Sequence, residues 1–155
     1  MKIKITLFTL LLFIALTGCK DAAPSPEPNP TGVSVALHNV LEMIEPQGVK
    51  LVPDTKAKEN SQWVLNGVKP EEFTLERAPE RLGIYIFKNK AEREQGFVDF
   101  KKQKEKYDMI VPIVWQNENA MVLYWHSSPL GQKTAYEDKL IKGLKGWDLQ
   151  FPNKY

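Results

Sequence analysis

His126 is followed directly by Ser127 and Ser128 at the end of an apolar run, a combination that suggests hydrolytic chemistry. In such chemistry the imidazole accepts the serine proton, while an acidic side chain orients the imidazole. The chain contains no G-x-S-x-G turn and no S-x-x-K pattern. A strand-end turn, continued by Pro129 and Gly131, is therefore the preferred interpretation, and a small hydrolase that uses His126 is the alternative function.

His38 and Glu42 lie four residues apart, so a helix would place both on one face, where a metal ion or a proton relay could use them. Metal sites commonly need three or four protein ligands, but the chain has two histidines, one cysteine and no H-E-x-x-H pattern. Adjacent carboxylates such as Glu71-Glu72 are ordinary on a charged surface. We therefore expect an exposed helix pair, no metal site, no cofactor and no catalytic residue.

Aromatic side chains are concentrated in the last third of the chain. Alternation along residues 120–126 places Trp125 on one face of a strand, and Tyr124 with His126 on the other. If helices cover only the Trp125 face, then Tyr124, His126 and Trp115 form an open surface that could bind a peptide or a glycan. Packing in the core and at its rim is the preferred interpretation.

Hydrophobic spacing predicts the elements of the first half of the domain. Apolar residues recur at intervals of three and four over residues 33–45, which predicts an amphipathic helix ended by Pro46 and Gly48. Residues 49–52 suit a short strand, and the polar residues 54–60 suit a loop. The Asn66-Gly67 pair predicts a tight hairpin turn within residues 63–68.

A capping pair marks the start of the next helix. Residues 82–87 form a β-rich run, after which Asn89 and Glu92 have the spacing of an N-terminal cap. Gly96 would lie inside this helix, where glycine costs about 1 kcal/mol relative to alanine. We therefore expect either close packing of Gly96 against another backbone or a weak point there.

The remaining elements are two strands and a helix. Residues 109–115 and 120–126 read as strands joined by a polar loop over residues 116–119, and Thr134 with Glu137 forms a second capping box. The order of elements predicts an α+β fold, namely one small domain over residues 33–155 with a mixed sheet and helices packed on at least one face. The strands at either end of residues 82–115 should run parallel if they share a sheet, whereas the final hairpin is antiparallel.

The N-terminus has the layout of a secretory signal peptide. Lys2 and Lys4 precede an apolar run over residues 5–16, which is too short to cross a bilayer as a helix. Leu16-Thr17-Gly18-Cys19 follows and resembles the lipobox of bacterial lipoproteins. That resemblance implies cleavage after residues 1–18, a diacylglycerol with acyl chains such as palmitate on Cys19, and a lipid anchor on the extracytoplasmic face of the cell membrane.

Charge and cysteine content exclude several classes of function. The chain has 21 basic and 19 acidic residues. Loss of Lys2 and Lys4 with the signal peptide would balance the charge, so nothing indicates a nucleic-acid partner. Cys19 is the single cysteine. The domain therefore forms no internal disulfide, and a thioredoxin-like arrangement could persist only without dithiol exchange.

Residues 19–32 form a lipidated cysteine and a proline-rich tether. Proline occupies every second position from 24 to 30. Such a segment favours the extended polyproline II geometry, which rises about 3.1 Å per residue and would hold the domain roughly 35 to 40 Å from the membrane.

Residues 65–70, 84–87 and 92–96 carry a resemblance to small, uncharacterised lipoproteins of Gram-positive bacteria. The resemblance implies an extracytoplasmic accessory protein and brings no catalytic residues with it. The sequence thus predicts a membrane-anchored lipoprotein that acts as a binding or interaction module, not an enzyme, for a protein, a peptide or an envelope polymer. A small cell-envelope hydrolase based on His126 and neighbouring polar residues is the alternative.

Overall fold

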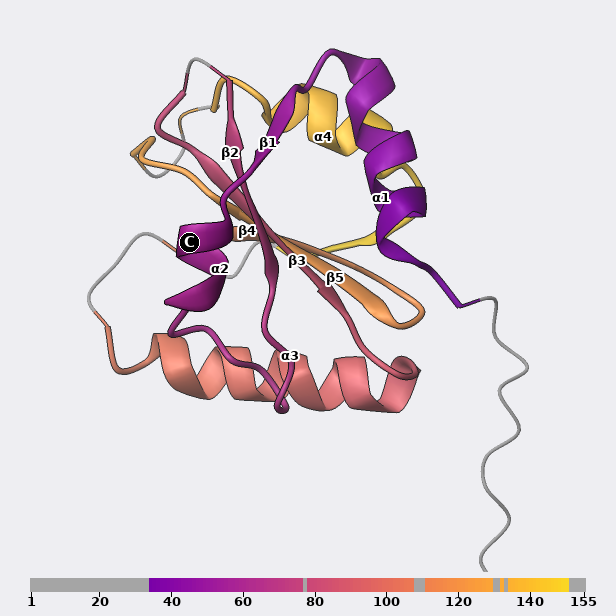
Figure 1. The fold of residues 1–155 in the computed structure, drawn as a ribbon, viewed down its shortest axis with the longest axis vertical. Helices are drawn as coiled ribbons and strands as arrows, with labels where there is room; N and C mark the ends of the chain where they lie inside the picture. The colour runs from indigo at the N-terminus through magenta and orange to yellow at the C-terminus, as the bar shows by residue number, and fades with distance from the viewer. Residues whose placement is uncertain (1–33, 77, 108–110, 130–131, 133, 151–155) are drawn as a thin grey trace, which may run out of the picture.

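A six-stranded sheet forms the centre of the protein (Figure 1). The structure is a computed structural model that describes residues 34–150 apart from 77, 108–110, 130–131 and 133. The strands lie in the order β1-β2-β3-β5-β4-β6. Their bounds are β1 Leu51–Pro53, β2 Glu71–Leu75, β3 Arg81–Ile86, β4 Ile113–Asn117, β5 Ala120–Trp125 and β6 Asp148–Gln150.

The sheet is antiparallel, which corrects the expected mixed sheet. β3 and β4 run parallel to each other, as the sequence predicts for the two ends of a strand-helix-strand unit. However, β5 folds back from β4 and inserts between them, and it is antiparallel to both. All hydrogen-bonded neighbours in the described sheet are therefore antiparallel, while the α+β class and the single sheet are confirmed.

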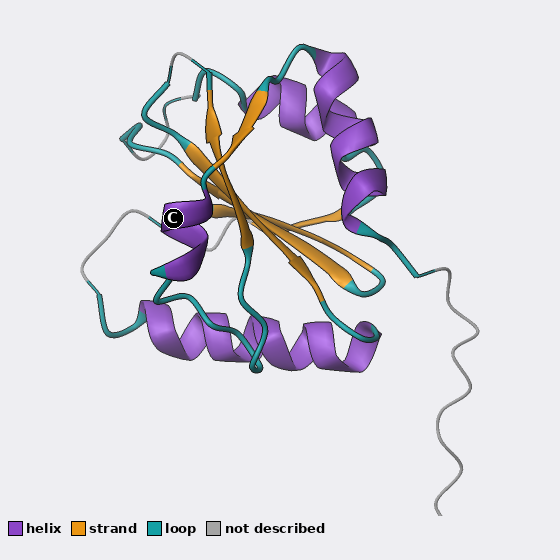
Figure 2. Ribbon diagram, in the orientation of Figure 1, coloured by secondary structure: helices purple, strands orange, loops and turns teal. Residues whose placement is uncertain are grey.

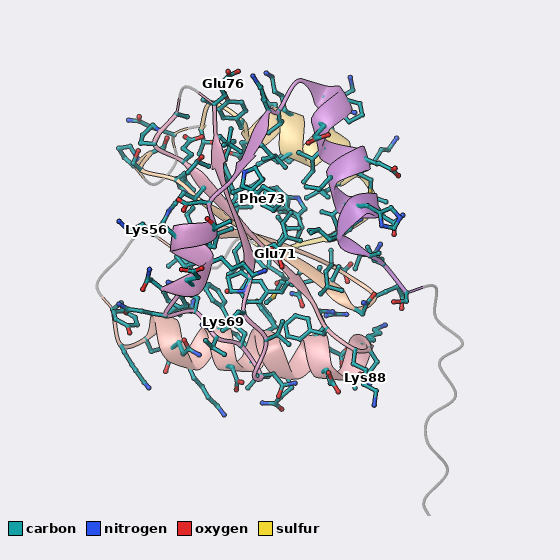
Figure 3. The ribbon with its side chains drawn as sticks, viewed as in Figure 1. Lys56, Lys69, Glu71, Phe73, Glu76 and Lys88 are labelled. Carbon is teal, nitrogen blue, oxygen red and sulfur yellow. The ribbon has the colours of Figure 1, made fainter. Side chains whose placement is uncertain are left out.

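Helices cover both faces of the sheet (Figure 2). Figure 1 shows α1 and α4 on one face and α3 on the other, with the short α2 beside the sheet. The helix bounds are α1 Leu37–Ile44, α2 Thr55–Glu59, α3 Lys90–Lys104 and α4 Glu137–Gly143, with a 3₁₀ turn η1 at Glu45–Gln47. Two buried clusters result, one on each face, and Phe73, labelled in Figure 3, belongs to the cluster under α1 and α4.

The first helix is shorter than its hydrophobic pattern. α1 begins at Leu37, with Ala36 as its N-cap, and residues 34–36 are not helical. Val33 lies outside the described residues. Val40 and Ile44 are fully buried, as the spacing predicts. Pro46 lies in η1, and Gly48 ends that turn with a φ of 73°, a left-handed conformation that favours glycine.

The hydrogen bonds of both predicted caps are present, although α4 begins at Glu137 and its N-cap residue is Tyr136 and not Thr134. Asn89 Oδ1 accepts the backbone N–H of Glu92 at 2.9 Å at the start of α3. Thr134 Oγ1 accepts the backbone N–H of Glu137 at 3.1 Å, and the Glu137 carboxylate accepts the backbone N–H of Thr134 at 3.5 Å. These pairs satisfy N–H groups that a helix start leaves without intrahelical partners.

Gly96 is a point of close contact between α3 and Phe87, the residue that follows β3. A Cβ at this position would lie 2.5 Å from the Phe87 ring, so the ring occupies the space that a side chain would need. The prediction of close packing is confirmed, although the neighbour is an aromatic side chain and not a backbone. The absence of a side chain at Gly96 thus lets α3 approach the sheet.

The Asn66-Gly67 turn is also confirmed. Both residues have positive φ, at 45° and 75°, and Leu65 and Val68 exchange two backbone hydrogen bonds of 2.9 Å. The turn is bound to α3, because the Asp99 carboxylate accepts the Asn66 N–H at 2.9 Å. The pairing extends no further than one bridge between Leu65 and Val68.

Three elements of the structure were not predicted, and β4 (Ile113–Asn117) extends into residues that were expected to form a loop. Residues 54–60, expected as a loop, contain α2, whose first turn is capped by Asp54 through the Ala57 N–H at 2.8 Å. β2 and β6 have no counterpart among the predicted strands. β6 is a three-residue edge strand that pairs with β4, and its sequence is too short to show a period.

Candidate functional site

Trp115 and Tyr124 do not form an open surface, which corrects one of the two interpretations of the aromatic residues. Their exposed fractions are 1% and 0%. Both belong to the buried cluster beneath α1 and α4, and their ring centroids lie 6.5 Å apart. The condition for an open sheet face fails because helices cover both faces, so packing in the core is the correct interpretation for these two side chains.

The Tyr124 hydroxyl is held in a buried polar group with Glu80 and Thr134. It donates to Glu80 Oε2 and lies 2.8 Å from Thr134 Oγ1. A hydroxyl has one proton, so Thr134 acts as the donor to Tyr124. Burial raises the pKa of Tyr124, and the hydrogen bond to Glu80 adds to this. The hydroxyl thus joins β5 to the residue before β3 and to the α4 cap, which is a structural role.

His126 follows β5 and is half-buried, with its ring centroid 5.7 Å from that of Tyr124. Its Nδ1 atom is buried and has no hydrogen-bond partner in the described part of the chain. Ser127 is exposed and Ser128 is half-buried. The structure therefore provides no acidic group on Nδ1 that would orient the imidazole for hydrolysis, at least among the residues that it describes.

His38 and Glu42 are both exposed on α1. His38 Nε2 lies 3.1 Å from the side-chain amide of Asn39. Within residues 34–150, leaving aside the undescribed positions, no group of three or more histidine, cysteine or acidic side chains could hold a metal ion. The pair thus occupies the exposed helix surface that the sequence predicts.

A pocket of about 370 Å³ lies between α2, the segment that follows α2, and the α3 face of the sheet. We call it the Glu72 pocket. Its lining combines one carboxylate, one guanidinium, two indoles and several amide or hydroxyl groups. The lining residues are Ala57, Asn60, Ser61, Gln62, Trp63, Glu72, Arg81 and Trp125.

Strand register places three of these side chains together. Side chains alternate along each strand, so Phe73 and Leu75 face α1 and α4, whereas Glu72 faces the opposite side. Arg81 pairs directly with Trp125 across β3 and β5. Residues on three neighbouring strands therefore form the floor of the pocket.

Glu72 is the buried acid of the site, with an exposed fraction of 7%. Ser61 Oγ donates to its Oε1 at 3.3 Å, but its Oε2 is buried and has no hydrogen-bond partner among the described residues. Burial raises the pKa of Glu72. The charge of Arg81 and the Ser61 hydrogen bond oppose this rise, and Asp54 adds to it. The neutral, protonated carboxyl is thereby favoured more than in an exposed glutamate.

Trp63 and Trp125 form the aromatic wall of the pocket. Their ring centroids lie 4.9 Å apart, with the ring planes tilted by 42°. Trp63 is further fixed by its backbone, since its N–H donates to Ser61 Oγ at 3.3 Å and its carbonyl accepts the Tyr85 hydroxyl at 2.7 Å. The wall is therefore preorganised before any ligand arrives.

Arg81 is the exposed cation at the mouth of the pocket. No acidic side chain in the described residues forms an ion pair with it within 4.0 Å. Its exposed guanidinium can therefore offer N–H donors to a ligand. Unlike Arg81, Glu71 has an ion-pair partner, because its carboxylate lies 2.6 Å from the Lys58 ammonium. Glu71 is the neighbour of Glu72 and is labelled in Figure 3.

Sequence patterns alone miss this site. Glu71-Glu72 resembles a surface pair, yet Glu72 is buried, because β2 is covered by the segment that follows α2. Trp125 is assigned to the correct face by alternation, but nothing local indicates that Trp63 meets it. The one sequence feature that could have indicated the site is the run of polar residues 60–62 directly before Trp63.

No family model, curated protein or solved structure matches this chain. The resemblance to small lipoproteins of Gram-positive bacteria thus stays a prediction. Residues 1–18, Cys19 and the proline-rich segment lie outside the described residues. Within the described ranges, no helix has the length and apolar character needed to cross a membrane.

Proposed function

We propose that this chain is a membrane-anchored extracytoplasmic lipoprotein that acts as a binding module, with the Glu72 pocket as its ligand site. The ligand is part of a peptide, a protein or an envelope polymer. One observation carries the proposal, namely that Glu72 Oε2 is a buried oxygen without a hydrogen-bond partner among the described residues, on a side chain that lines a pocket.

A buried acceptor without a partner costs about 1 to 3 kcal/mol. Its persistence calls for a compensating role, and a ligand donor that enters the pocket supplies the missing bond. The terminal torsion of a glutamate is broad, so a small rotation brings Oε2 toward an entering group. The exposed guanidinium of Arg81 offers donors on the adjacent strand.

The predicted N-terminal segment supports the same function. A lipid on Cys19 and a polyproline spacer would place the pocket outside the cell and within reach of the envelope. Two acyl chains hold a protein on a membrane much more firmly than one. A tethered binding domain needs no catalytic group, and the proposal assigns none.

The test uses the full-length lipoprotein in detergent and a soluble digest of bacterial cell wall that contains both glycan and peptide. Trp63 and Trp125 line the pocket, so entry of a ligand should change the intrinsic tryptophan fluorescence in a saturable way. Glu72→Ala should abolish the change. Glu71→Ala is the matched control, because Glu71 is the adjacent carboxylate and already pairs with Lys58.

Circular dichroism establishes that each variant is folded before the titration. A digest that leaves the fluorescence of the folded parent protein unchanged would contradict the proposal. An equal response from the Glu72→Ala and Glu71→Ala variants would also contradict it, because the binding would then occur elsewhere.

A further inference from the structure

We infer that the Glu72 pocket binds a pyranose ring of an envelope polysaccharide. The inference rests on the proposed function and specifies its ligand. Its basis is the convergence, in one pocket of about 370 Å³, of two indole rings with hydroxyl, amide, carboxylate and guanidinium groups from separate segments of the chain.

The aromatic wall suits a sugar ring. A pyranose carries C–H groups on its ring faces and hydroxyls around its edge, so it can contact an apolar surface and a polar surface at once. Trp63 and Trp125 pack against each other with their centroids 4.9 Å apart, and both line the pocket, so the part of each indole that faces the pocket can contact a ligand. The ring centroid of Phe100 lies 5.7 Å from that of Trp63 and 6.4 Å from that of Trp125. This third ring therefore packs against both indoles.

The polar groups of the lining suit hydroxyls. A sugar hydroxyl both donates and accepts, so it can satisfy an acceptor and a donor together. Glu72 Oε2 needs a donor, and the guanidinium of Arg81 offers donors with no ion pair within 4.0 Å in the described residues. Asn60, Ser61 and Gln62 add neutral amide and hydroxyl groups at the same pocket.

The charges of the lining disfavour simple ions. Among the described residues, Glu72 and Arg81 are the two ionisable side chains that line the pocket. An isolated ammonium ligand would meet Arg81, and an isolated phosphate or carboxylate would meet Glu72. A neutral polyhydroxylated ligand avoids both conflicts. A zwitterionic peptide also carries both charges, but a short aliphatic peptide offers no ring to place against the two indoles.

The experiment is an NMR titration of the ¹⁵N-labelled full-length protein in detergent micelles. The probes are chitotriose, cellotriose, the dipeptide alanyl-alanine and glycerol phosphate. The chain has four tryptophans, which provide an internal control. Indole N–H signals of Trp63 and Trp125 should shift, whereas those of Trp115 and Trp147, buried in the cluster on the opposite face, should not.

The inference predicts a saturable shift with at least one trisaccharide, and an affinity loss of about tenfold or more in both Glu72→Ala and Arg81→Ala, because each removes a hydrogen-bonding charged group. Arg81 is exposed, so its variant keeps the test valid even where Glu72→Ala fails to fold. Ser127→Ala, at an exposed position, is the control and should leave the affinity unchanged.

Binding of only the dipeptide or only glycerol phosphate would overturn the sugar assignment, as would the absence of a response to every probe. The proposed function is tested separately from the sugar inference. If the cell-wall digest binds in a Glu72-dependent way while neither trisaccharide does, the binding module stands and the sugar inference fails.

Discussion

Gly83 lies directly opposite Glu72 in the β2 and β3 pair, so the two residues share the face of the sheet that carries the Glu72 pocket. A Cβ at Gly83 would stand 3.7 Å from Glu72 Oε2. A methyl group there would make an ordinary van der Waals contact with this oxygen, which is buried. Burial of the carboxyl is also the main cause that raises the pKa of Glu72.

Glu72→Gln should make stability less dependent on pH. Burial raises the pKa of Glu72 above its ordinary value of 4.5, so the folded state holds the proton more tightly than the unfolded chain. From pH 4.5 up to the raised pKa, the folded state binds more protons, and its free energy of unfolding falls as pH rises. The glutamine variant has no such proton to lose.

Urea unfolding between about pH 4 and about pH 8 measures this effect. The stability of Glu72→Gln relative to the parent protein should increase with pH across that range. Glu71→Gln provides the control for the loss of one carboxylate at the surface. A difference between Glu72→Gln and the parent that stays constant with pH would count against the assignment.

Gly96→Ala should destabilise the domain although alanine is the better helix former. The helix preference would add about 1 kcal/mol, but the new methyl group would stand 2.5 Å from the Phe87 ring. Overpacking of this kind typically costs about 1 to 3 kcal/mol. Thermal or urea unfolding measures the net loss.

The double variant Gly96→Ala with Phe87→Leu separates the two effects. A smaller side chain at Phe87 should relieve the clash, so the double variant should lose less stability than the sum of the two single variants. Stabilisation by Gly96→Ala alone would show that α3 does not depend on this contact.

Tyr124→Phe should lower the free energy of unfolding by about 1 to 3 kcal/mol, because Glu80 and Thr134 lose a buried partner. Ligand binding in the Glu72 pocket should stay unchanged, since Tyr124 lies on the other face of the sheet. Tyr107→Phe at an exposed position should change stability by less than about 0.5 kcal/mol. A loss of binding in folded Tyr124→Phe would argue that the two faces communicate.

Cys19→Ala should yield a folded protein without lipid. Cys19 is the single cysteine, so no other thiol can accept the diacylglycerol. Metabolic labelling with a radioactive fatty acid should label the parent chain and leave the variant unlabelled, while circular dichroism of the two domains should agree. Persistent labelling of the variant would refute the lipobox assignment.

Features that depend on a few adjacent residues could be predicted from the sequence. The caps at Asn89 and Thr134 each join residues three apart, and the Asn66-Gly67 turn needs only the positive φ that these residue types tolerate. The alternation of side chains between the two faces of β5 is equally local, although both faces of this strand are buried. Such features can be predicted because the interacting residues are only a few positions apart in the sequence.

The order of the strands and the burial of Glu72 could not be predicted in this way. Insertion of β5 between β3 and β4 depends on pairing across long stretches of chain, and it turns an expected mixed sheet into an antiparallel one. The second helical layer that buries Trp115 and Tyr124 likewise joins α1 to α4 from opposite ends of the domain.

The sequence by itself determined the local structure of this protein, namely the capped helices, the Asn-Gly turn and the α+β class, because backbone preferences and side-chain periodicity act over a few residues. Only the tertiary structure decided that Glu72 would be buried, hydrogen-bonded to Ser61 and placed in one pocket with two indoles. Desolvation of a carboxylate depends on everything that surrounds it in space, and those neighbours come from separate strands and loops.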